Sequence, residues 1–95
     1  MTKLNFKHFN KYTGISRKQK ETGDAREEFA DLVYRHAGGI KAHALAFKIF
    51  ESAGEEEYND EEVTIIRYVA EKYCLPGFID GLHEMLSESG TDKNE

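Results

Sequence analysis

The sequence contains little cysteine and no long hydrophobic run, and each shortage excludes a class of protein. Cys74 is the single cysteine, so the disulfide bonds that stabilise many small extracellular domains cannot form within the chain. No apolar stretch has the length that a membrane-spanning helix needs, and the first residues do not resemble a secretory signal. We therefore expect a cytoplasmic protein that does not bind membranes.

The sequence also lacks the motifs that many enzymes use. It has no glycine-rich phosphate loop, no dinucleotide-binding fingerprint and no nucleophile elbow. None of the histidines has a histidine or cysteine at zinc-ligand spacing: these are His8, His36, His43 and His83. We expect His36 to be structural and Cys74 to be a small buried hydrophobic residue. The sequence therefore predicts no enzyme, no metal and no cofactor.

Negative charge is absent from the start of the chain. Residues 1–20 contain six Lys/Arg and no acid, whereas the remaining seven Lys/Arg and all 18 Asp/Glu lie in residues 21–95. The net charge is therefore +6 in the first segment and −11 in the second, which together give the −5 of the whole chain. Such an asymmetry indicates that the two segments have different roles.

Beyond the first segment the dominant pattern is helical periodicity. Apolar side chains recur at intervals of three and four residues, as on the buried face of a helix. Asp24 with Glu27 and Asn59 with Glu62 have the spacing of capping boxes, and Gly38–Gly39 is typical of a helix end. These patterns predict four helices, at roughly 25–37, 40–53, 60–73 and 77–87.

We accordingly predict an all-α fold, a compact bundle of about four helices preceded by a basic N-terminal arm. The arm covers residues 1–23, an acidic helical domain covers 24–87, and a disordered polar tail covers 88–95. Within the arm, Ser16 and Gln19 have capping-box spacing, which predicts a short extra helix. The first apolar residues of the arm fit both a two-residue and a helical period, so both conformations remain open there.

Lysines and arginines of the arm alternate with aromatic residues, a combination that suits contacts with phosphates and bases. Residues 9–19 also resemble the turn of helix-turn-helix DNA-binding proteins, with Gly14, Ile15 and Ser16 at matching positions. Asn10 departs from that pattern, which has a small residue there. The alternative is that the aromatic residues anchor the arm to the body while its lysines stay in water. If the arm binds nucleic acid, its candidate residues are Lys3, Lys7, Lys11, Arg17, Lys18, Gln19 and Lys20.

The segment Glu55–Glu62 is strongly acidic, with six Asp or Glu among its eight residues. It has no glycine at the position that a calcium-binding EF-hand loop requires, so we expect no calcium site. Two interpretations remain. A dense acid cluster on a rigid body can mimic DNA and occupy a basic groove of a partner. Otherwise the segment is a solvated loop whose last acids favour the start of a helix.

From these patterns we expect a small non-catalytic interaction or regulatory protein, comparable to phage-encoded regulators and inhibitors. Its partner would be a protein or nucleoprotein, and the chain itself a monomer or homodimer. The nucleic-acid-binding arm and the acidic DNA mimic are the alternatives. Partner contacts are expected at acids and tyrosines of the body, because tyrosine is frequent at interfaces. The candidate protein-binding residues are Glu55, Glu56, Glu57, Tyr58, Asp60, Glu61 and Tyr68.

Overall fold

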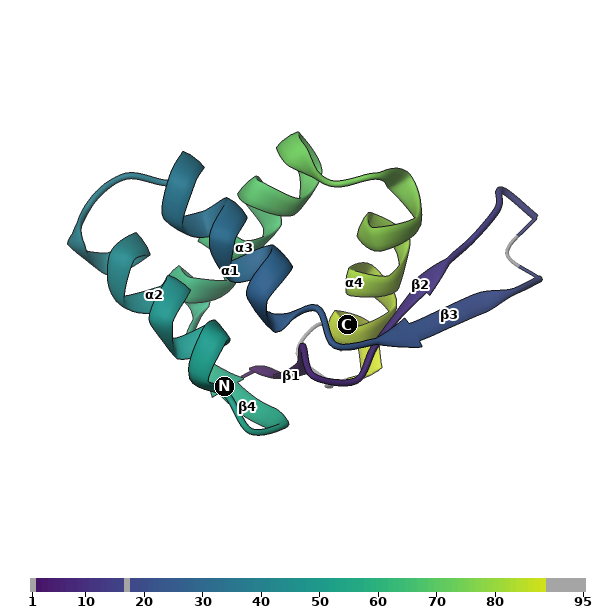
Figure 1. The fold of residues 1–95 in the computed structure, drawn as a ribbon, viewed down its shortest axis with the longest axis horizontal. Coiled ribbons are helices and arrows are strands. Elements are labelled where there is room, and N and C mark those ends of the chain that lie inside the picture. The colour runs from purple at the N-terminus through teal and green to yellow at the C-terminus, as the bar shows by residue number, and fades with distance from the viewer. Residues whose placement is uncertain (1, 17, 89–95) are drawn as a thin grey trace.

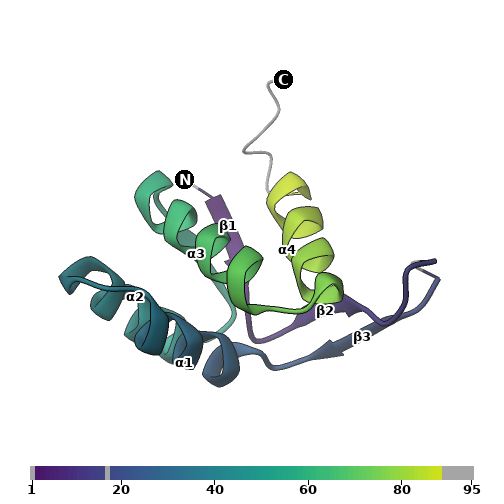
Figure 2. The same ribbon diagram turned by 90° about the horizontal axis from the view of Figure 1, so that it is seen from above.

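The computed structural model describes residues 2–16 and 18–88, and within them the chain forms four helices and four strands (Figure 1). In chain order these are β1 (Thr2–Asn5), β2 (Phe9–Tyr12), β3 (Lys20–Gly23), α1 (Arg26–His36), α2 (Ile40–Glu51), β4 (Glu55–Tyr58), α3 (Asp60–Tyr73) and α4 (Pro76–Glu88). Figure 2 shows α1 and α2 side by side in one layer and α3 and α4 in a second.

None of the described helices is long and apolar enough to cross a membrane. The polar tail predicted at the C-terminus lies outside the described residues from residue 89 onward, and α4 includes residue 88.

The predicted all-α class is wrong, because two pairs of strands accompany the helices. β1 pairs antiparallel with β4, and β2 pairs antiparallel with β3. In β1 the side chains of Thr2 and Leu4 are buried while Lys3 is exposed, so the start of the chain adopts the two-residue period. β4 forms from a Glu-rich sequence of low strand propensity because Tyr58 at its end is buried opposite Thr2.

The short extra helix predicted within the N-terminal arm is also wrong, since a β-hairpin occupies this part of the chain. Tyr12 lies opposite Lys20 across β2 and β3, and the Thr13 N–H donates to the Gln19 carbonyl at 3.1 Å where the hairpin turns. Because residues 9–12 are a strand, the segment lacks the first helix of a helix-turn-helix motif.

The four helices lie where the sequence predicts them, with ends that differ by up to two residues. The capping box of α3 is confirmed: the Asn59 side chain accepts from the Glu62 N–H, and the Glu62 carboxylate accepts from the Asn59 N–H, both at 2.8 Å. The box predicted for α1 is wrong, because Asp24 instead accepts from the N–H and guanidinium of Arg26. Before α2, Gly39 adopts a φ of +95°, which glycine tolerates best.

A stack of phenylalanine rings joins the strands to the helices. Phe6 stacks on Phe9 and on Phe29, with ring centroids 5.8 and 5.1 Å apart. Phe78 of α4 closes the stack, with its ring centroid 4.3 Å from that of Phe9 and 5.4 Å from that of Phe29. All four side chains are buried, and each contributes on the order of 1.5–3 kcal/mol of transfer free energy. Phe6 and Phe9 of the N-terminal segment therefore belong to the core.

Two glycines allow the backbone of β2 to lie directly against α4. A side chain at Gly77 would collide with the carbonyl oxygen of Tyr12, and a side chain at Gly81 would collide with that of Asn10. A glycine inside a helix costs about 1 kcal/mol relative to alanine. The close contact between strand and helix gives the physical reason for glycine at these positions.

Candidate functional site

The described lysines of the N-terminal segment are interspersed with acids of other elements. Lys3 lies opposite an acid of β4, and Lys11 lies opposite an acid of β3. The Nζ atom of Lys20 is 3.3 Å from a carboxylate oxygen of Glu84. Arg17 lies outside the described residues. The remaining members of the predicted nucleic-acid set are at least partly exposed: Lys7, Lys18 and Gln19.

The predicted protein-binding acids are divided between a strand and the first turn of a helix. Glu55–Glu57 form most of β4, whereas Asp60 and Glu61 begin α3. The Nζ atom of Lys41 lies 2.6 Å from a carboxylate oxygen of Glu61, so this acid has a partner within the chain. The predicted loop is therefore wrong for residues 55–58, which form a strand, whereas the prediction that the last acids lie at the start of a helix is confirmed.

The two predicted interface tyrosines lie in different environments. Tyr58 is fully buried, and the Nζ atom of Lys48 lies 4.7 Å from its ring centroid. Burial, with a smaller effect of the Glu56 charge, raises the pKa of the Tyr58 hydroxyl. Tyr68 is half exposed on α3, with the Nζ atom of Lys72 at 5.7 Å from its ring centroid. Of this pair, Tyr68 has surface available to a partner and Tyr58 is a core residue.

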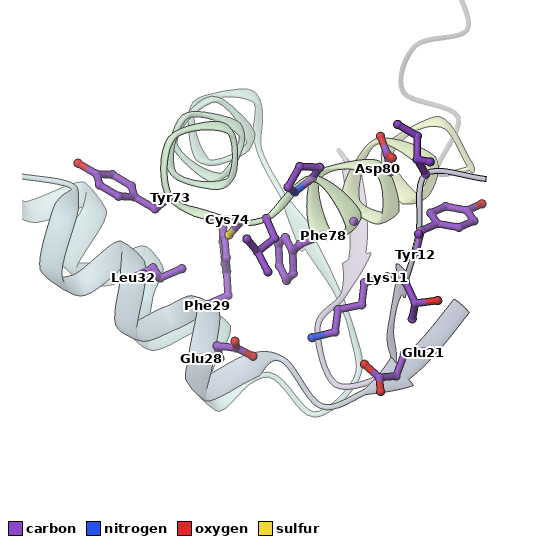
Figure 3. A pocket seen from close by; sticks show the side chains of 16 residues that line it. Lys11, Tyr12, Glu21, Glu28, Phe29, Leu32, Tyr73, Cys74, Phe78 and Asp80 are labelled. Atoms are coloured by element: carbon purple, nitrogen blue, oxygen red, sulfur yellow. The ribbon is translucent and has the colours of Figure 1, made fainter. Parts of the chain in front are cut away.

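A cleft of about 890 Å³, which we call the hairpin cleft, opens between the β2–β3 hairpin, α1 and the link from α3 to α4 (Figure 3). Three segments that are distant in sequence form its walls. They are residues 11–15 and 21 of the hairpin, residues 28, 29 and 32 of α1, and residues 73–78 and 80 of the link and α4.

Apolar side chains form the floor and two edges of the hairpin cleft. Phe29 and Phe78, two members of the phenylalanine stack, line the floor together with Leu32. At the edges, Leu75 is 79% exposed and Ile15 is 101% exposed. Large aliphatic side chains in water beside an apolar floor are unfavourable for an isolated chain and are typical of a surface that a partner covers.

The charged residues of the hairpin cleft are mainly acidic. Glu21, Glu28 and Asp80 supply three carboxylates, and Lys11 is the one cation among the described lining residues (Figure 3). The electrostatic potential of the cleft therefore favours a positively charged partner group.

Cys74 lies in the wall of the hairpin cleft and is half-buried. Burial, with a contribution from the nearby charge of Glu28, raises the pKa of its thiol to about 11. Because the thiolate is the nucleophilic form, a thiol with this pKa stays protonated and unreactive at neutral pH.

The side chains of His36, His43 and His83 contact neighbouring side chains. The His36 ring stacks on Tyr73 at the edge of the hairpin cleft, with centroids 4.0 Å apart, and the Nε2 atom of His83 lies 3.5 Å from a carboxylate oxygen of Glu71. Across residues 2–16 and 18–88, no group of three or more His, Cys, Asp or Glu is placed to hold a metal ion.

The hairpin cleft could not be predicted from the sequence, because its walls come together only when the hairpin packs on α4. Two signals in the sequence point toward it. Leu75 directly precedes the single proline, and Ile15 lies beside a glycine in a turn. Each is a large aliphatic residue outside any periodic apolar stripe, and such residues are seldom needed for the core.

Comparisons with protein-family models, with curated proteins and with solved structures find no match for this chain. No relative therefore indicates an activity or a partner. The positions of the chain's own residues are the basis for assigning a function.

Proposed function

We propose that this chain is a small non-catalytic interaction protein and that a partner protein docks in the hairpin cleft. The observation that carries the proposal is the exposure of Leu75 and Ile15 at the edges of an apolar floor. An apolar side chain of the partner would fill the cleft and cover both residues. This arrangement corresponds to the usual interface, with an apolar centre and a polar rim.

The charges around the hairpin cleft support a partner segment that combines an apolar anchor with Lys or Arg. Glu21 lies on the hairpin, Glu28 on α1 and Asp80 on α4, so each wall carries one carboxylate (Figure 3). Opposite charges at the rim of an interface accelerate the encounter and set the orientation of the partner more than they raise affinity.

The state of Cys74 supports binding over catalysis at this site. It is the residue of the cleft wall with the greatest nucleophilic potential, and its raised pKa keeps it in the unreactive thiol form. The floor below it consists of aromatic and aliphatic side chains that offer packing surface and no proton transfer.

The two alternative functions receive less support from the positions of their residues. Nucleic-acid binding needs positive potential, and the acid beside Lys20 reduces it. DNA mimicry needs a dense array of unpaired acids, and Lys41 and Lys48 lie within 3.0 Å of carboxylate oxygens of Glu61 and Glu62.

Selection from a random peptide library displayed on phage, with the whole chain as bait, tests the proposal. We expect the selected peptides to share an aliphatic or aromatic residue next to Lys or Arg. Isothermal titration calorimetry should then show that Leu75→Asp lowers the affinity for the best peptide by about tenfold or more, as expected for a residue central to an interface.

The matched control is Ile40→Asp, since Ile40 is 82% exposed and lies outside the hairpin cleft. We expect this variant to bind the peptide like the wild type. If both variants weaken peptide binding equally, or if neither weakens it, the proposal is contradicted. Salt-dependent binding of duplex DNA that Lys18→Ala abolishes would instead support the nucleic-acid alternative.

A further inference from the structure

A second surface, which we call the aromatic groove, lies where α1 and α2 run side by side (Figure 2). It has a volume of about 200 Å³ and contains three large rings. Tyr34 is 57% exposed, Phe47 45% and Phe50 49%. The Tyr34 and Phe47 rings stand nearly perpendicular, at 85°, with centroids 6.1 Å apart. The Tyr34 and Phe47 rings therefore form two adjoining walls of an aromatic corner.

Two carboxylates accompany these rings. Glu27 and Asp31 line the groove from α1, four residues apart and therefore on the same face of the helix. The face of an aromatic ring carries partial negative charge and attracts cations, and a carboxylate does so more strongly. The groove contributes apolar contact area and negative charge at the same place, which is the chemistry that recognises an organic cation.

A ring beside a carboxylate also occurs elsewhere in the chain, and there a lysine of the same chain binds between the two. The Nζ atom of Lys48 lies 4.7 Å from the centroid of the Tyr58 ring and 3.0 Å from a carboxylate oxygen of Glu62. This combination of ring, carboxylate and cation is complete within the fold.

A comparable cluster lies on the hairpin. The Nζ atom of Lys20 lies 5.4 Å from the centroid of the Tyr12 ring and 3.3 Å from Glu84. In the aromatic groove no lysine or arginine of the described residues lies over the rings. The His43 ring instead borders the corner, with its centroid 5.8 Å from that of Tyr34 and 5.1 Å from that of Phe47. Arg35, one turn further along α1, meets Asp31 at 3.3 Å.

We propose that the aromatic groove binds an arginine side chain of a partner protein. Arginine suits this site better than lysine because its planar, weakly hydrated guanidinium stacks on a ring while its N–H groups donate to carboxylates. In an open groove the more strongly hydrated ammonium of lysine keeps more of its water. The proposal does not depend on the hairpin cleft, since the lining residues of the two sites are different.

Nuclear magnetic resonance titration of the full chain with N-acetylarginine amide tests this assignment. We expect the ring signals of Tyr34, Phe47 and Phe50 to shift with a millimolar dissociation constant, while the Tyr73 ring, stacked on His36, does not shift. N-acetylcitrulline amide has the same shape without the charge, and we expect it to bind at least about fivefold more weakly. N-acetyllysine amide should fall between the two.

Two variants address the two components of the groove. Glu27→Gln combined with Asp31→Asn removes the charge, and Phe47→Leu removes one ring wall; each should weaken the arginine derivative several-fold. Glu51→Gln is the matched control on α2, because Glu51 is exposed and lies outside the groove. Unchanged affinity in both groove variants overturns the proposal, as does equal binding of the arginine and citrulline derivatives. Ring shifts that depend on protein concentration without any ligand would also overturn it, because a second copy of the chain would then cover the rings.

Discussion

The two antiparallel strand pairs have the same length, four residues in each strand, yet different interactions hold them. β1–β4 places Leu4 and Tyr58 in the core, whereas every residue of β3 is exposed. The hairpin is tied to the body through Phe9 and through the backbone contact of β2 with Gly77 and Gly81. An isolated two-stranded hairpin is marginally stable in water. β1–β4 is therefore stabilised mainly by buried side chains, whereas the hairpin depends on one buried side chain, that of Phe9, and on the fit of its backbone on α4.

The largest effect should come from removing the ring that connects both pairs to the helices. Phe6→Ala leaves a cavity in the middle of the phenylalanine stack, and such truncations cost about 3–5 kcal/mol. That is a large share of the roughly 5–15 kcal/mol that stabilises a typical domain.

Urea denaturation measures the change in the free energy of unfolding. As a control, Phe47→Ala should cost about 1 kcal/mol or less, because Phe47 is nearly half exposed; equal losses would contradict the assigned core.

A substitution at Gly81, with a smaller expected effect, distinguishes the backbone contact between β2 and α4 from the helix propensity of residue 81. Gly81→Ala improves helix propensity by about 1 kcal/mol. Because its methyl group would collide with the Asn10 carbonyl oxygen, we expect a net destabilisation of about 1–2 kcal/mol.

Hydrogen exchange should show that the hairpin loses protection in this variant while β1–β4 retains it. Gly54→Ala is the matched control, because nothing lies within 4 Å of a side chain there, and we expect no loss of stability. A stabilising Gly81→Ala would show that β2 does not rest on α4.

The smallest effect concerns the charged junction between β3 and α1. Hydrogen bonds from the side chain and then the backbone of Arg26 lower the pKa of Asp24 from 3.8 to about 2. A carboxyl group whose pKa is lower in the folded state stabilises the fold above its unfolded pKa, and this contribution disappears as the pH falls through the folded pKa. Urea midpoints should therefore show wild type above Asp24→Asn near neutral pH and no difference below about pH 2. A difference that grows on acidification would contradict this.

Local signals in the sequence were sufficient to place the helices. The Asn59–Glu62 capping box is an interaction between near neighbours, so the residue types determine it directly. α1 ends before Gly38–Gly39 as predicted, but its C-cap is Ala37 in an extended conformation, and the left-handed Gly39 precedes α2. The burial of Cys74 is only partial, and its position in the wall of a cleft depends on the hairpin that packs nearby.

The strands could not be read in the same way. β3 has the sequence Lys-Glu-Thr-Gly and β4 has Glu-Glu-Glu-Tyr, neither of which alternates apolar and polar residues along a buried face. Each is a strand because a partner strand satisfies its backbone hydrogen bonds, and for β4 that partner is β1, about 50 residues earlier in the chain. Capping-box spacing at Ser16 and Gln19 was misleading for the same reason, because pairing with β2 outweighs a weak local preference.

For the candidate sites too, local sequence determines some features and tertiary packing determines the others. The exposed aromatic residues of α1 and α2 could be located on helices from their spacing, but their exposure depends on which helix face the core selects. The prediction of Glu55, Tyr58 and their neighbours as an interface rested on local charge and residue type alone. It could not show that pairing of β4 with β1 buries Tyr58.

The pairing of β1 with β4 also sets an order of events during biosynthesis. Leu4 lies opposite Glu56, so β1 is made about 50 residues before its partner strand. At a synthesis rate of about 5–20 residues per second, that interval lasts roughly 3–10 s. During this time α4, whose Phe78 later stacks on Phe9, has not yet been made. In that interval the segment from Leu4 to Phe9 exposes apolar side chains that a chaperone can recognise, and β1 reaches its final position only after β4 has been made.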